Sequence, residues 1–125
     1  MAGVTLDTGA LIAIERADRR MQALLDEAHM AGLAIDIPAG TLAQAWRSGP
    51  RQARLSRTLH LGNVTVRALD EPVAKAAGIL CGQRGTGDVV DASVVINARL
   101  RDHTVITSDA ADLRRLNPQL RMVEI

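Results

Sequence analysis

Residues 3–15 read Gly-Val-Thr-Leu-Asp-Thr-Gly-Ala-Leu-Ile-Ala-Ile-Glu. The apolar run at 3–6 predicts a short buried strand, and the polar residues and glycine at 7–9 predict the loop that ends it. The residues from 10 to 15 are typical of a helical turn. A strand that passes directly into a helix is the repeating unit of α/β folds, so this stretch sets the expectation for the rest of the chain.

The same alternation of strand and helix patterns continues to the end of the sequence. Strands are expected at residues 33–37, 64–68, 104–107 and 122–125. Helices are expected to begin at Asp18, near Thr41, at Pro50, at Asp70 and after Asp88, and a flexible loop is expected from Gly82 through Gly85 to Gly87. Parallel strands need helical crossovers, so the pattern predicts an α/β fold, a three-layer sandwich with a central parallel sheet of four to five strands.

Composition indicates one domain, residues 1–125, with an aliphatic core. The chain has 125 residues, 47% of them hydrophobic, with one tryptophan and no phenylalanine or tyrosine. Ala, Leu, Val and Ile must therefore fill the core, which favours helices packed on a sheet over an all-β fold. The net charge of +1 predicts no global attraction to nucleic acid or to an anionic membrane.

The expected location is the cytoplasm. Cys81 is the only cysteine, so no internal disulfide can form, and the first 15 residues lack the basic start and unbroken apolar run of a signal peptide. No stretch approaches the roughly 20 apolar residues that a membrane-spanning helix needs. We therefore expect no membrane association.

Four aspartates fall where strands end or helices begin. Asp7 ends the first expected strand, Asp109 follows the strand at 104–107, and Asp88 and Asp91 lie three apart in the first turn of a helix. The functional crevice of an open parallel sheet lies beyond the carboxyl ends of its strands, so we expect these carboxylates to converge. Such a cluster must take up protons or hold cations, and oxygen ligands alone select Mg²⁺ or Mn²⁺. An ion of this kind activates water, so the pattern predicts hydrolysis of phosphodiester bonds.

Three short segments carry a more specific signal. They are Leu6-Asp7-Thr8-Gly9-Ala10-Leu11-Ile12, Asp88-Val89-Val90-Asp91-Ala92 and Val105-Ile106-Thr107-Ser108-Asp109. In this order they resemble the PIN-domain family, specifically the VapC-type toxins, and the resemblance extends over nearly the whole chain. It implies an Mg²⁺- or Mn²⁺-dependent endoribonuclease, the toxin component of a type II toxin–antitoxin system. It also implies a homodimer and a cognate VapB-like antitoxin as partner.

Carried over position by position, the resemblance implies a catalytic and metal-binding set of Asp7, Asp91 and Asp109, with Asp88 as a further ligand and Thr8 and Ser108 as polar neighbours. One position departs from the family pattern. Many members have a glutamate in the helix after the second strand, where this sequence has Gln44. A neutral amide can coordinate or hydrogen-bond but brings no charge, so we expect altered metal affinity, with weak or lost activity as an open alternative.

The aspartates also have purely structural interpretations. Asp7 and Asp88 are well placed to cap the helices that follow them, and Asp109 is placed to cap a short last helix, although Ser108 can serve there instead. An acid in the first turn, such as Asp91, stabilises a helix only slightly. We prefer the functional interpretation for Asp91 and Asp109 and keep both interpretations for Asp88.

Arginines form the one concentrated basic stripe of the sequence, at Arg47, Arg51, Arg54 and Arg57 with spacings of three and four. Charged helix faces are more often solvated than bound to a partner, but guanidinium groups also suit phosphate oxygens. Two interpretations therefore stay open, a solvated face and an RNA-binding surface formed by Arg47, Arg51 and Arg54.

Two other functions are compatible with this fold class. A phosphotransfer domain with Asp7 as nucleophile would need a lysine near the phosphoryl group, and Lys75, the only lysine, lies inside an expected helix. A catalytically inactive module that acts through RNA or antitoxin binding alone is the other, and Gln44 motivates it. The histidines lack zinc-ligand spacing and are expected to be structural, namely His29, His60 and His103.

Overall fold

Strands and helices alternate along residues 2–125, the part of the chain that the computed structural model describes. The strands are β1 Gly3–Leu6, β2 Ala34–Pro38, β3 Val64–Arg67, β4 Thr104–Thr107 and β5 Met122–Glu124. The helices are α1 Thr8–Glu15, α2 Arg19–Met30, α3 Ala39–Ala45, α4 Ala53–Leu59, α5 Glu71–Arg84, α6 Val89–Arg101 and α7 Ala110–Leu116. A 3₁₀ turn, η1 Pro50–Gln52, lies between α3 and α4. The expected alternation is confirmed.

The strands form one parallel sheet in the order β3-β2-β1-β4-β5. The chain builds outward from β1 to β3, crosses back over the sheet through α5 and α6, and then adds β4 and β5 on the other side of β1. The winding therefore reverses at β1, and the carboxyl ends of β1 and β4 lie side by side. This is the position where open α/β sheets carry their functional crevice.

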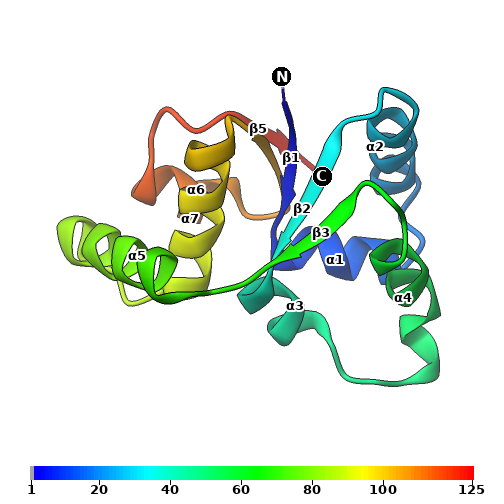
Figure 1. Cartoon of the computed structure of the whole chain (residues 1–125), viewed down its shortest axis with the longest axis horizontal. Helices are drawn as coiled ribbons and strands as arrows, with labels where there is room; N and C mark the ends of the chain where they lie inside the picture. The colour runs from blue at the N-terminus through cyan, green and yellow to red at the C-terminus, as the bar shows by residue number, and fades with distance from the viewer. Residues whose placement is uncertain (1) are drawn as a thin grey trace.

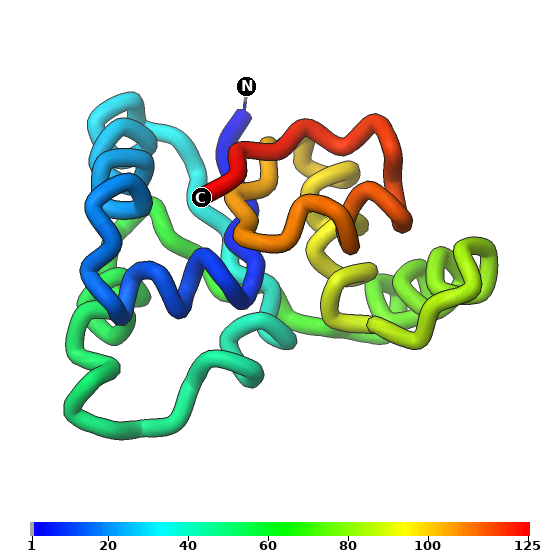
Figure 2. The backbone as a smooth tube through the Cα atoms, turned by 180° about the vertical axis from the view of Figure 1, so that it is seen from behind, coloured from blue at the N-terminus to red at the C-terminus, as the bar shows by residue number. Residues whose placement is uncertain are grey.

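Helices cover both faces of the sheet, as Figures 1 and 2 show from opposite sides. Val4 and Leu6 of β1 pack with residues of α1, α2, α3 and α4, whereas Val105 of β4 packs with α5, α6 and α7. The alternation of side chains along each strand separates these two aliphatic cores. The fold is thus an α/β sandwich with a five-stranded parallel sheet, as the sequence predicts.

Aspartates define the starts of several helices. Asp18, Asp70 and Asp88 each accept a hydrogen bond from the backbone N–H three residues further on, at 2.8 to 3.0 Å. These are the expected N-caps, and each satisfies a backbone donor that the first turn leaves free. Among the described residues, no helix is both long enough and apolar enough to cross a bilayer.

Several boundaries differ from expectation by a few residues, and the helix expected at Pro50 begins instead with the 3₁₀ turn η1 and continues as α4 from Ala53. α1 begins at Thr8 rather than at residue 10, because the Asp7 carboxylate caps it. α5 continues through Gly82 to Arg84 and ends at Gly85, whose φ of +68° is the left-handed conformation that favours glycine. The expected flexible loop at 82–87 is therefore wrong in its first part, since residues 82–84 are helical.

Candidate active site

Asp7 stands at the end of β1 and is almost fully buried, with 5% of its surface exposed. Its Oδ1 accepts a hydrogen bond from the backbone N–H of Ala10 at 2.9 Å, which caps α1. Its Oδ2 accepts a hydrogen bond from the hydroxyl of Thr107, at the end of β4. The capping interpretation of Asp7 is confirmed, and the same two bonds hold its carboxylate in one orientation at the edge of the sheet.

The turn after β4 is built around Thr107. Its hydroxyl also accepts a hydrogen bond from the backbone N–H of Asp109 at 2.8 Å, so one side chain joins the ends of β1 and β4. Ser108 packs over Gly9, where an added Cβ would lie 1.8 Å from the Ser108 hydroxyl oxygen, so the close approach of the two turns requires glycine. Asp109 occupies the N-cap position of α7, although its side chain makes no well-formed cap hydrogen bond of the kind that Asp7 and Asp88 make.

The first turn of α6 contributes the second pair of acids. Asp88 caps this helix, because its Oδ1 accepts a hydrogen bond from the backbone N–H of Asp91 at 3.0 Å. Asp88 is exposed, whereas Asp91 is partly buried. The structural role of Asp88 is therefore confirmed, and a role in metal binding stays a prediction.

Electrostatic effects link these carboxylates to one another. The pKa of Asp91 is raised to about 7, first by burial and then by the negative charge of Asp88, with smaller contributions from Asp112 and Asp109. A hydrogen bond with Asp112, followed by burial, raises the pKa of Asp109, and the charge of Asp7 acts in the same direction. Burial raises the pKa of Asp7. Asp7 and Asp109 follow the paired strands β1 and β4, and the charge of Asp109 acts on Asp91, so Asp109 lies between the other two acids in this set of interactions.

Asp112, in the first turn of α7, belongs to the same cluster although the sequence motifs did not single it out. It lies three residues after Asp109, the spacing that also separates Asp88 from Asp91. That repeated spacing is the signal from which it can be found. Asp88, Asp91 and Asp112 line a hollow of about 200 Å³ together with Arg84 and Arg115, whereas Asp7 and Asp109 lie outside its lining.

The cluster suits a hard cation by its chemistry but is not a closed cage. Within residues 2–125, no three Asp, Glu, His or Cys side chains stand close enough together to enclose an ion. The donors are carboxylate oxygens alone, which favour Mg²⁺ or Mn²⁺ over zinc. Mg²⁺ usually keeps several of its waters and binds through one or two carboxylates, so an open acidic cluster of this kind fits it.

Helix α3 brings Gln44 to the edge of the acidic cluster. The amide oxygen of Gln44 accepts a hydrogen bond from the hydroxyl of Thr8, the residue directly after Asp7. The position where the family resemblance implies a glutamate therefore contacts the cluster through a neutral hydrogen bond. Ser108 and Thr8 both lie at this edge, as expected for polar neighbours of the site.

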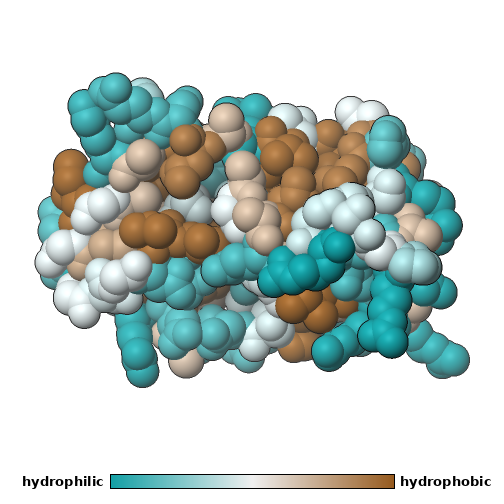
Figure 3. Space-filling view, turned by 90° about the horizontal axis from the view of Figure 1, so that it is seen from below, coloured by the Kyte–Doolittle hydropathy of each residue, from teal (hydrophilic) through white to brown (hydrophobic). Residues whose placement is uncertain are grey.

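The arginines of the basic stripe do not share one helix, yet they line one groove. Arg47 follows α3, Arg51 lies in η1, and Arg54 and Arg57 lie in α4. All four line a groove of about 620 Å³, together with Arg16 from the end of α1. Figure 3 shows the molecule from the carboxyl edge of the sheet, and hydrophilic side chains project on its right, the side on which η1 and α4 lie in Figure 1.

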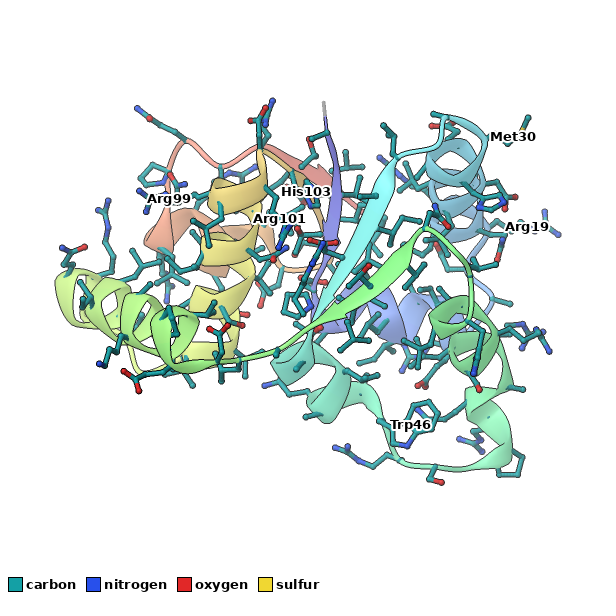
Figure 4. All side chains as sticks on the ribbon, viewed as in Figure 1. Arg19, Met30, Trp46, Arg99, Arg101 and His103 are labelled. Atoms are coloured by element: carbon teal, nitrogen blue, oxygen red, sulfur yellow. The ribbon has the colours of Figure 1, made fainter. Side chains whose placement is uncertain are left out.

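A second charged cluster lies between α6 and the sheet, and no sequence motif indicated it. Asp36 of β2 is fully buried, and its Oδ2 lies 3.1 Å from Arg67 Nε and 3.3 Å from Arg101 Nε. Asn97 donates a hydrogen bond to the same oxygen at 3.1 Å, and His103 lies nearby with Arg101, as Figure 4 shows. This cluster ties α6 to the sheet and so supports the helix that carries Asp91.

The histidines lie apart from the acidic cluster. Burial lowers the pKa of His103, which contacts the Thr5 hydroxyl at 3.0 Å. His29 contacts the Asn63 side chain and His60 the Ser56 carbonyl. These local contacts agree with structural roles for all three.

The surroundings of Asp7 disfavour phosphotransfer. Both of its carboxylate oxygens accept hydrogen bonds, none of them from a cationic side chain. Lys75, the only lysine of the sequence, pairs with Glu71 at 2.6 Å on the exposed surface of α5. A phosphoryl group on Asp7 would therefore have no lysine beside it.

The sheet order and the helices on both faces define the class of fold, a five-stranded parallel α/β sandwich with acidic residues at its carboxyl edge. Three solved structures share this fold over almost the whole of both chains. VapBC2 from Rickettsia felis bound to promoter DNA matches at 18% identity, with a TM-score of 0.72 and coverage of 98% of each chain. DNA-bound VapBC from Salmonella typhimurium matches at 19% identity with a TM-score of 0.69, over 99% of this chain and 98% of that one.

A toxin–antitoxin complex from Klebsiella pneumoniae matches at 19% identity, with a TM-score of 0.72, over 98% of this chain and all of that one. No family model matches the sequence. No curated protein matches it either. At these identities the likeness shows a shared fold, and function must be argued from the site.

Proposed function

We propose that this chain is a PIN-domain endoribonuclease of the VapC type, the toxin component of a type II toxin–antitoxin system, and that it depends on Mg²⁺ or Mn²⁺. The observation that carries the proposal is that Asp7 and Asp109 follow the neighbouring strands β1 and β4, with Asp91 near enough for the charge of Asp109 to raise its pKa. The fold shared with the toxin–antitoxin structures supports it.

Asp7, Asp91 and Asp109 would hold the ion, with Asp88 or Asp112 completing its surroundings. A divalent cation bound there supplies activation of water and neutralisation of charge on the phosphate. The protein contributes orientation, because Thr107 and the first turn of α1 fix both oxygens of Asp7. The raised pKa of Asp91 means that its ionisation completes only above neutral pH unless a cation favours the charged form.

RNA cleavage by single-residue variants tests the proposal. Asp7→Asn and Asp109→Asn should each reduce Mn²⁺-dependent cleavage of a fluorescent RNA by about 100-fold or more, because each removes a charge from the site. Asp26→Asn is the matched control, since Asp26 lies on the exposed surface of α2. Circular dichroism verifies that each variant is folded. Cleavage that persists in EDTA and in both site variants would refute the assignment.

The toxin role implies a protein partner and a cellular effect. We propose a VapB-like antitoxin as that partner, a homodimer as the assembled form and the cytoplasm as the place of action. Expression of the chain should arrest growth, and co-expression of a small neighbouring reading frame should relieve the arrest. Light scattering should give twice the mass of the 13.3 kDa chain. A monomer, or growth unaffected by the active chain, would contradict these parts of the proposal.

An inactive binding module is the second candidate. The neutral Gln44 and the open arrangement of the acids favour it. Calorimetric titration with Mn²⁺ separates the two candidates, because a nuclease must bind the ion. Absence of binding at millimolar Mn²⁺ would favour a module that acts through RNA or antitoxin binding alone.

A further inference from the structure

A groove rich in arginine runs between α1 and the η1–α4 segment. It has a volume of about 620 Å³, and its charged residues are Arg16, Arg47, Arg51, Arg54, Arg57 and Glu15. We call it the arginine groove. Five cations against one carboxylate concentrate positive charge here, although the whole chain has a net charge of only +1. The groove therefore attracts anions in a way that the overall composition hides.

These arginines are free to bind a ligand. All five are exposed, and none forms an ion pair with an acid of residues 2–125. The single acid of the groove, Glu15, accepts a hydrogen bond from the side-chain amide of Gln52. The positive charge is thus not cancelled internally.

A buried amide holds the wall of the groove in place. Gln52 is 5% exposed, and its Oε1 accepts hydrogen bonds from the backbone N–H groups of Arg47 and Ser48 at 2.6 and 2.7 Å. Its Nε2 donates to the Ala45 carbonyl at 2.9 Å. The guanidinium of Arg47 is itself held by a 2.7 Å bond to the carbonyl of Trp46. The segment between α3 and α4 is therefore a defined surface, and Arg47 is oriented before any ligand binds.

The arginine groove reaches the acidic cluster. Gln44 lines the groove and accepts the hydrogen bond from Thr8, beside Asp7. Ile12 and Arg16 also line a neighbouring hollow of about 420 Å³, which extends to Gly9 and Ser108. A chain lying in the groove would therefore continue to the edge of the sheet where the aspartates gather.

We propose that the arginine groove binds the sugar–phosphate backbone of single-stranded RNA and leads the strand to the acidic cluster; this inference rests on the proposed function. A charged groove that tracks one backbone is the usual design of single-strand binding. Guanidinium forks match phosphate oxygens. The sole aromatic side chain, Trp46, packs against the core, so bases have no ring on which to stack. Binding is therefore tolerant of base sequence and strongly dependent on salt.

The test measures binding without catalysis. A 5′-labelled 12-nucleotide RNA is titrated with the full chain in EDTA and followed by fluorescence anisotropy from 50 to 200 mM salt. Five phosphate contacts predict about a 100-fold loss of affinity over this range. The double variant Arg51→Gln/Arg54→Gln should bind about 10-fold more weakly at 100 mM salt and lose only about 20-fold over the range. Arg99→Gln is the control, since Arg99 lies on α6 and does not line the groove, and Figure 4 shows it well away from Trp46.

The outcomes separate this inference from the proposed function. One result is that the double variant and the Arg99→Gln control bind RNA with equal affinity and equal salt dependence. That result would refute RNA binding by the arginine groove, even if the chain cleaves RNA. Binding of an acidic poly-glutamate peptide with no binding of RNA would also overturn it, in favour of a protein partner. Weaker RNA binding by the double variant supports the groove, even if no cleavage is found.

Discussion

Replacement of Asp91 by asparagine measures how much the ionised Asp91 carboxylate destabilises the folded protein. The change keeps the size of the side chain and removes its charge. The Asp88 cap is kept, because it uses the backbone N–H of residue 91, while the side-chain interaction between Asp88 and residue 91 changes with the charge. The variant should therefore differ from the native chain mainly in the energy of one ionised carboxylate.

The magnitude follows from the raised pKa. A pKa of about 7 in place of 3.8 means that the folded state binds an extra proton between these pH values, so native stability falls as pH rises from about 4 to 7. For a fully buried group this loss would reach about 4 kcal/mol at pH 8. Asp91 is only partly buried, and solvent screening reduces the value to about 2 kcal/mol. Asp91→Asn should thus stabilise the metal-free protein by about that amount at pH 8, by less than half of it at pH 5 and by little at pH 4.

Urea unfolding at pH 5 and pH 8, with EDTA or with Mn²⁺, measures these differences. In EDTA the Asp91→Asn variant should gain stability over the native chain at both pH values, but less than half as much at pH 5 as at pH 8. Mn²⁺ should raise the free energy of unfolding of the native chain more than that of the variant, because the ion binds only the folded state. Asp26→Asn, on the surface of α2, should change neither comparison.

Two results would refute this reasoning. If Asp91→Asn changes stability equally at pH 5 and pH 8, its carboxylate is not strained in the folded state. If Mn²⁺ stabilises the native chain and the variant by the same amount, Asp91 does not take part in cation binding.

Three further substitutions test how the site is built, each by urea unfolding. Thr107→Val removes the hydroxyl that joins Asp7 to the turn after β4 and should cost about 1–3 kcal/mol; an unchanged stability would contradict this bridge. Gly9→Ala should lower the free energy of unfolding by about 1–3 kcal/mol, because the added methyl group clashes with Ser108. The second substitution Ser108→Gly should restore most of this stability. If it does not, the clash is not the cause of the loss. Asp36→Asn leaves two arginines without their buried partner and should cost about 3 kcal/mol, whereas a neutral result would show that the ion pairs contribute nothing.

Local signals in the sequence are sufficient for most of the fold. Short apolar runs, capping aspartates and glycine stops act within a few residues of one another, so the strands and helix starts follow from neighbouring residues. Asp7, Asp91 and Asp109 can be selected in the same way, because each lies at the end of a strand or the start of a helix. The error at residues 82–84 has a local cause too, since a glycine inside a helix resembles a loop signal until packing decides.

Contacts between distant parts of the chain are decided only by the tertiary structure. The bond from Thr107 to Asp7 spans 100 residues, and the pairing of Asp36 with Arg101 depends on how α6 lies over the sheet. No periodic pattern records such contacts, because they depend on strand order and helix packing together. The same holds for the arginine groove, in which Arg16 joins residues of η1 and α4. The sequence by itself therefore determined which side chains carry charge and where elements begin, and folding decided which of those charges face one another.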